Sequence, residues 1–231
     1  MTEPQRGLVR LELRSPRAAA IAGIVYSVLI LAVMLLSRRA TDGDPQHITA
    51  EFLQASSATF RLVLIMVPFA GIAFLWFTGV VRDRLHDKED RFFATIFFGS
   101  GIAEVLLLLL WGALLATMVN VANLAATGSI EKVSPDIYIF GSLLMNEIIG
   151  DYALRMAGLY MTAIATLWFR TSIMPLWLIV LTFALAAGFL LAPPGFPNAR
   201  LGFPSWVLIV SVYILIMNYR PQSEGVGGQA G

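Results

Sequence analysis

The sequence predicts an all-α integral membrane protein, a bundle of six transmembrane helices with both termini in the cytoplasm. Three observations predict this fold: an apolar composition, apolar runs long enough to cross a bilayer, and an uneven distribution of basic residues. Of the 231 residues, 58% are apolar or aromatic and 13% are charged, and the mean hydropathy is +0.76. A soluble domain is about 45 to 50% apolar and about 25% charged. This composition excludes a soluble globular protein, a disordered chain and a nucleic-acid-binding protein, because each of these needs a polar or basic surface.

Charge-free runs define four of the six predicted spans. A helix needs about 20 apolar residues to cross a hydrocarbon core of about 30 Å. Runs of this length, bounded by basic residues or prolines, are 18–37, 62–81, 173–192 and 201–219. Pro68 falls inside the second run, where it removes a backbone hydrogen bond and predicts a kinked helix.

The other two predicted spans carry charged residues. We place the third span at 96–118, which contains Glu104, and the fourth at 150–169. Continuous helix over 137–169 would be ~50 Å long, longer than the hydrocarbon core even when tilted. Part of that stretch must therefore leave the membrane, and we expect residues 135–149 to form an interfacial or protruding extension.

Three prolines mark predicted helix starts. Ser15-Pro16 and Ser134-Pro135 pair a capping hydroxyl with a proline, and Pro204 follows Phe203. A proline suits the first helical turn because its missing N–H would have no partner there.

The basic residues orient the bundle. With the N-terminus inside, ten Lys and Arg residues lie in cytoplasmic segments and five in outer segments. This excess favours cytoplasmic termini. The predicted organisation is a cytoplasmic N-terminal segment (1–17), a six-helix transmembrane domain (18–219) and a disordered C-terminal tail (220–231). We interpret the first span as an uncleaved anchor, since its apolar run is too long for a signal peptide and ends in Ser-Arg-Arg.

Ionisable residues inside the spans are the candidates for function, because they are costly in lipid. Glu104 and Arg155 lie ~20 and ~22 Å along their helices from the cytoplasmic ends, so an ion pair between the two helices is one interpretation. Glu147, Asp151 and Arg155 are spaced four residues apart on one helix face, so a pair within the helix is the other. Both remain open. The predicted site is the intramembrane charge cluster Glu104, Glu147, Asp151 and Arg155, acting as a structural clamp or lining a pathway.

Other kinds of chemistry are not supported. The chain has no cysteine, and its two histidines, His47 and His86, fall in predicted loops on opposite sides of the membrane. We therefore expect no catalytic residues, no metal and no cofactor. No phosphate-binding glycine loop follows a strand. Gly99-Ser100-Gly101 is interpreted, together with Gly112, Ala116, Ala153 and Ala157, as small-residue helix packing.

One segment carries a resemblance. Residues 67–77, Val-Pro-Phe-Ala-Gly-Ile-Ala-Phe-Leu-Trp-Phe, are followed by Arg82-Asp83-Arg84 and by residues 90–95, Asp-Arg-Phe-Phe-Ala-Thr. This pattern resembles one found in small uncharacterised bacterial multi-pass membrane proteins. The resemblance covers the second and third spans, and it implies location and topology, not an activity.

The sequence thus predicts a multi-pass protein of the cell membrane without an identifiable catalytic site. The first interpretation is a non-enzymatic membrane component or accessory subunit. The alternative is a small transporter or channel that uses Glu104 and Arg155, and an intramembrane enzyme is the least favoured class. We expect the lipid bilayer as a partner, with other membrane proteins or further copies of this chain, and neither nucleic acid nor nucleotide.

Overall fold

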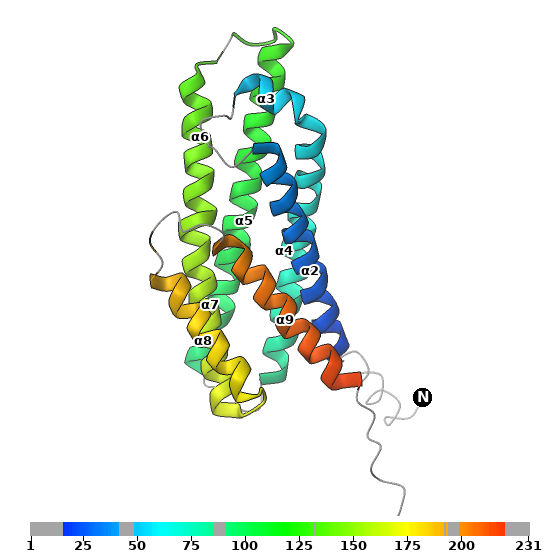
Figure 1. The fold of residues 1–231 in the computed structure, drawn as a ribbon, viewed down its shortest axis with the longest axis vertical. Coiled ribbons are helices and arrows are strands. Elements are labelled where there is room, and N and C mark those ends of the chain that lie inside the picture. The colour runs from blue at the N-terminus through cyan, green and yellow to red at the C-terminus, as the bar shows by residue number, and fades with distance from the viewer. Residues whose placement is uncertain are drawn as a thin grey trace, which may run out of the picture.

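The computed structural model describes residues 16–41, 49–85, 91–131, 133–191, 193 and 199–219, and its described elements are all helical. Their order along the chain is α2 (Pro16–Thr41), α3 (Ala50–Ala55), α4 (Ser57–Leu85), α5 (Arg91–Ala126), α6 (Pro135–Glu147), the π-helical segment η2 (Ile148–Ala153), α7 (Leu154–Thr171), α8 (Leu176–Leu191) and α9 (Ala199–Tyr219) (Figure 1). The predictions for residues 1–15, for the tail 220–231, and for His47 and His86 lie outside the described residues.

Four helices are long and apolar enough to cross a membrane. They are α2, α4, α5 and α9, and they correspond to the first, second, third and sixth predicted spans. Helix α8 is apolar but has only 16 residues, because the chain does not enter the helix until after Pro175. The described chain is therefore an all-helical membrane-type protein, while the count of six spans and the position of the termini stay predictions.

The stretch predicted to contain the fourth span is one long rod. Helix α6, η2 and α7 follow one another in line (Figure 1). Ser134 caps the rod by accepting the backbone N–H of Asp136, and Pro135 occupies the first turn, as predicted. Residues 135–149 thus extend the rod along its axis, which is the protruding alternative and not a helix lying across it.

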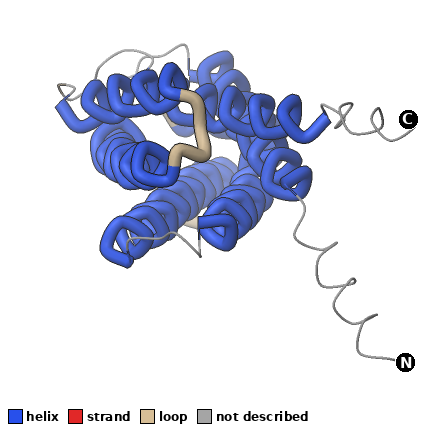
Figure 2. The backbone as a smooth tube through the Cα atoms, turned by 90° about the horizontal axis from the view of Figure 1, so that it is seen from below, coloured by secondary structure: helices blue, strands red, loops and turns tan. Residues whose placement is uncertain are grey.

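The helices form a single bundle (Figure 2). Helix α2 packs on α4 and α9, α5 packs on α4 and α7, and α7 packs on α8. Helices α8 and α9 accompany only the lower part of the bundle in Figure 1. We call the part beyond them the upper tier: α3, α6, the N-terminal part of α4 and the C-terminal parts of α2 and α5 (Figure 1). The remainder is the lower tier.

One predicted helix start is wrong. Pro204 lies inside α9, which begins five residues earlier at Ala199. Pro204 is the sixth residue of α9 and lies beyond the four N-terminal N–H groups that have no partner. It therefore leaves the Arg200 carbonyl without its usual donor and costs the helix one hydrogen bond. Pro68 lies inside α4, as predicted.

Small residues bring helices together, as the sequence indicated, although not at every position. A Cβ atom at Gly101 would lie 3.1 Å from the Tyr160 ring, and one at Gly112 would lie 3.1 Å from Val67. These two glycines let α5 approach α7 and α4. Gly99 meets nothing within 4 Å and is not a packing residue.

Candidate functional site

A small cavity lies between α2, α5, α9 and the rod. Its volume is about 40 Å³, which is room for a few water molecules. Twelve residues line it: Tyr26, Ile30, Met34, Glu104, Leu108, Ile149, Ala153, Leu154, Ala157, Arg200, Phe203 and Pro204. The wall is mostly apolar, and Glu104 and Arg200 supply its charges. The cavity therefore collects one carboxyl and one guanidinium group from helices far apart in the sequence.

Glu104 is the sequence-predicted residue that faces this cavity. Its Oε2 atom is buried and has no hydrogen-bond partner among the described residues. Burying an unpaired polar atom costs free energy, and a buried charge costs more. A buried oxygen without a protein partner beside a water-sized cavity is the most distinctive chemical feature of the described chain.

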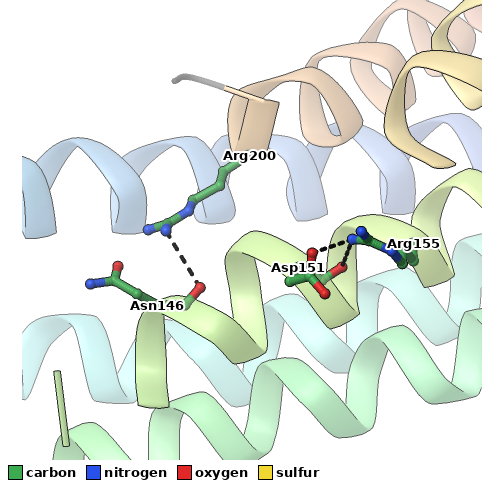
Figure 3. A network of polar contacts seen from close by, with 4 residues as sticks. All are labelled: Asn146, Asp151, Arg155 and Arg200. Atoms are coloured by element: carbon green, nitrogen blue, oxygen red, sulfur yellow. Dashed lines mark hydrogen bonds and ion pairs between the residues drawn. The ribbon is translucent and has the colours of Figure 1, made fainter. Parts of the chain in front are cut away.

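Arg200 is the cavity residue that sequence reasoning missed. It lies in the first turn of α9, and its Nη2 atom donates to the Asn146 carbonyl oxygen at 3.5 Å (Figure 3). The guanidinium crosses Gly150, where a Cβ atom would lie 2.8 Å from Nη2. In the sequence Arg200 is one more basic residue at the edge of a span. Only the tertiary fold brings it to the rod.

Arg155 pairs within its own helix. Its Nη1 atom forms an ion pair with the Asp151 carboxylate and also donates to the Asp151 carbonyl oxygen at 3.3 Å (Figure 3). This is the intrahelical alternative predicted from the four-residue spacing. Within the described residues Arg155 does not pair with Glu104, and Glu147 is exposed. The structure thus divides the predicted charge cluster into a partly buried pair within the rod, an exposed Glu147 and a separate cavity acid, Glu104.

The π-helical segment η2 shapes one wall of the cavity. Ile149 and Ala153, both in η2, line it, and Asp151 lies between them in the sequence. A π segment contains an extra residue per turn and disturbs the regular hydrogen-bond ladder, and such segments occur frequently at functional sites. Here it follows Asn146, whose carbonyl Arg200 contacts, by two residues. The irregular backbone and the charged residues therefore occur at the same level of the rod.

Aromatic side chains close the cavity on its lower side. Tyr26 and Phe203 line the cavity and also pack against Phe74, with ring centroids 4.7 and 5.5 Å away. Tyr160 continues the cluster at 5.3 Å from Phe74. Trp206 follows at 6.2 Å from Tyr160, and all five rings are buried. We call these five residues the aromatic floor.

Two hydrogen bonds fix the aromatic floor. The hydroxyl groups of Tyr160 and Thr78 lie 3.1 Å apart, and Trp206 donates its indole N–H to the Thr182 hydroxyl at 2.9 Å. Buried hydroxyl and indole groups need such partners. The floor therefore joins α4, α7, α8 and α9 below the cavity.

Within the described ranges, no cluster of three or more His, Asp or Glu side chains is arranged to hold a metal ion. The site instead consists of one carboxyl group, one guanidinium group and space for water. None of the protein-family models, curated protein sequences or solved structures with which the chain was compared matches it, so the site is interpreted from its own residues.

Proposed function

We propose that the protein is a non-enzymatic component of the cell membrane, an accessory subunit whose upper tier binds another membrane protein outside the bilayer. The proposal needs two steps: a position for the bilayer, and a surface that lipid does not cover. Helix lengths support the position of the bilayer, and exposed apolar side chains on α6 support the surface.

The lower tier has the dimensions of a hydrocarbon core. Helix α8, with 16 residues, is ~24 Å long, and Arg170 and Asp151 are separated by ~28 Å along the rod. Arg82, Arg91 and Arg170 are at the lower ends of their helices, and Arg200 is at the upper end of α9. Because a hydrocarbon core is about 30 Å thick, these basic residues would lie at its two boundaries. This placement leaves the upper tier in water.

An apolar face of α6 is the observation that carries the proposal. Phe140 is 68% exposed, and Ile137, Leu143 and Leu144 are exposed beside it. Exposed apolar side chains are ordinary where lipid covers them, but outside the bilayer a contiguous apolar face indicates a binding surface for protein. The exposed acids Asp136 and Glu147 lie at the two ends of this face, which favours a partner helix with basic ends.

Site-specific photocrosslinking in the native membrane tests this proposal. A photoreactive residue at Phe140 should yield adducts with a protein. The matched control is Leu159 on the same rod, which is 36% exposed and lies near the midpoint between Asp151 and Arg170, and it should yield lipid adducts. Lipid adducts alone at both positions would refute the proposed surface.

The cavity favours a second candidate, a small transporter. Its specific support is the unpaired Oε2 of Glu104. Since Arg155 is paired with Asp151, Arg200 would take the role first assigned to Arg155. The aromatic floor would have to rearrange before a solute could pass, and for this reason we rank this function second. Loss of solute or proton flux in reconstituted vesicles with Glu104→Gln would favour it. Unchanged flux together with a co-purifying partner would favour the accessory function.

A further inference from the structure

We propose that the Glu104 cavity is a hydrated proton-binding site that exchanges with the aqueous phase on the side of the upper tier. This inference rests on the position of the bilayer proposed above, but it requires neither a protein partner nor a solute that crosses the membrane. The ligands are water and a proton.

The cavity fits these ligands in size and chemistry. About 40 Å³ admits a few water molecules and excludes organic solutes of ordinary size. A water molecule is retained only where polar partners surround it. Oε2 of Glu104 lacks a protein partner, and Arg200 and Tyr26 line the same space. Water in the cavity would supply the hydrogen bond that the protein does not.

The lining residues indicate the direction of access. Helix α2 rises toward the upper tier, so Met34 lies ~12 Å above Tyr26 on that side of the cavity. Arg200 lies above Phe203 because α9 descends (Figure 1). Below, the aromatic floor is packed and buried. Water and protons therefore reach Glu104 past Arg200 and Met34, and not from the lower end.

Few groups compete for the proton. Helix α2 contributes Tyr26 and α9 contributes Arg200, while η2 and α7 contribute only apolar lining residues. Helix α4 meets this part of α5 at apolar positions, with Gly71 against Val105. An arginine keeps its proton in proteins. Among the cavity-lining groups, Glu104 is thus the one that binds and releases it.

The proton transfer balances without a further reagent. On uptake, a hydronium ion in the cavity gives a proton to the Glu104 carboxylate, an O–H bond forms, and water remains. On release, the O–H bond breaks and water carries the proton outward past Arg200. The site alternates between a carboxylate near a guanidinium and a neutral acid near a guanidinium, so its net charge changes by one.

A hydrophobic carbodiimide, which adds covalently to protonated carboxylic acids, tests the site in the full-length chain with Glu104 unchanged. Sealed vesicles are prepared in both orientations, and the orientation is assigned by labelling Phe140→Cys with an impermeant thiol reagent. The pH is stepped in the medium while the lumen is buffered, and mass spectrometry measures the adduct at Glu104. Where the upper tier faces the medium, labelling should fall at least about tenfold over two pH units above the midpoint of titration.

Where the lower end faces the medium, labelling should not change. Labelling that follows the pH at the lower end, or that is independent of pH on both sides, would overturn the proposal. Glu104→Gln should abolish the adduct, which would identify Glu104 as the labelled residue. Arg200→Gln removes a cation that favours the carboxylate, so labelling should persist to higher pH. An unshifted profile in the folded Arg200→Gln variant would contradict the proposed site, in which Arg200 and Glu104 face the same water.

Discussion

At the scale of single residues, Gly23 sets the distance between α2 and α9. A Cβ atom there would lie 2.0 Å from the Ser211 hydroxyl and 2.9 Å from the Phe77 ring. Gly23→Ala should therefore destabilise the folded protein by about 1 to 3 kcal/mol through overpacking. Reversible unfolding in detergent measures the change in free energy. Gly99→Ala is the control, because nothing lies within 4 Å of its Cβ position, and it should be neutral or slightly stabilising.

The double variant Gly23→Ala/Ser211→Ala provides a further test. Ser211→Ala removes the hydroxyl group that lies nearest to the added Cβ atom, so the double variant should regain part of the stability lost in Gly23→Ala. If Gly23→Ala is as stable as the wild type, α2 and α9 are not as close as the structure has them.

The hydrogen bond between Trp206 and Thr182 gives a second prediction for single residues. Thr182→Val keeps the shape of the side chain but removes the acceptor of the buried indole N–H. Leaving that group unsatisfied should cost about 1 to 3 kcal/mol of unfolding free energy. The control is Thr117→Val, since the Thr117 hydroxyl is exposed and donates to the carbonyl of its own helix. Equal stabilities of the two variants would contradict the prediction.

The candidate site was predictable from the sequence only in part. Glu104 is evident because it is the one ionisable residue in a long apolar run, and the Asp151–Arg155 pair follows from helical spacing. Arg200 could not be found, because its role depends on which helix ends meet in space. Since the sequence does not show which side chains meet in space, Arg155 could be considered as a partner for Glu104, whereas in the structure it pairs with Asp151.

At the scale of elements, η2 sets the rotation of α6 relative to α7. Deleting Tyr152, whose side chain is exposed, removes the extra residue and should convert η2 to regular α-helix. One residue corresponds to about 100° of rotation, so the face with Phe140 should turn away from its present direction. A cysteine at position 140, in this cysteine-free chain, should label with a water-soluble thiol reagent more slowly in the deletion variant.

A folding control distinguishes a rotation of α6 from unfolding of the deletion variant. The lower tier should remain folded, which a cysteine at buried Ser27, a nearly isosteric replacement, reports by staying unlabelled. Unchanged labelling at position 140 would show that η2 does not determine the direction of α6.

Helix positions were predictable where composition determines them. The apolar runs and Ser134-Pro135 located most helices to within a few residues. The helix start predicted at Pro204 was wrong, because α9 begins at Ala199 and accommodates the proline in its second turn. The π segment could not be anticipated, because its extra residue is accommodated by packing between helices and has no local sequence signal.

At the scale of the whole molecule, the two tiers face different solvents in our proposal. Leu159→Lys would place an ammonium group near the middle of the hydrocarbon core, at a cost of about 2.5 to 3.5 kcal/mol on insertion scales. Phe140→Lys would place the same group in water. We therefore expect a lower yield of inserted, folded protein for Leu159→Lys and a normal yield for Phe140→Lys. Quantification of the membrane fraction and its monodispersity measures both, and equal losses would contradict the placement of the bilayer.

The all-helical architecture with membrane-length helices was predictable, because the apolar runs in the sequence are long enough to cross a bilayer. The count of six spans and the side of the termini stay predictions. The two tiers were not predictable, since α5 is predominantly apolar on both sides of Glu104 and gives no sign of where the bilayer ends. Only the shorter neighbours α8 and α9 mark that level.

The unequal helix lengths have a practical consequence for purification. A detergent belt assembles around a width matched to its own alkyl tails, and around this protein it would cover the surface flanked by α8 and α9. The face of α6 with Phe140 would project beyond the belt and adhere to the same face of another particle. We expect concentration-dependent clustering that milder or longer-tailed detergents do not cure, and that an added soluble helix with basic ends does.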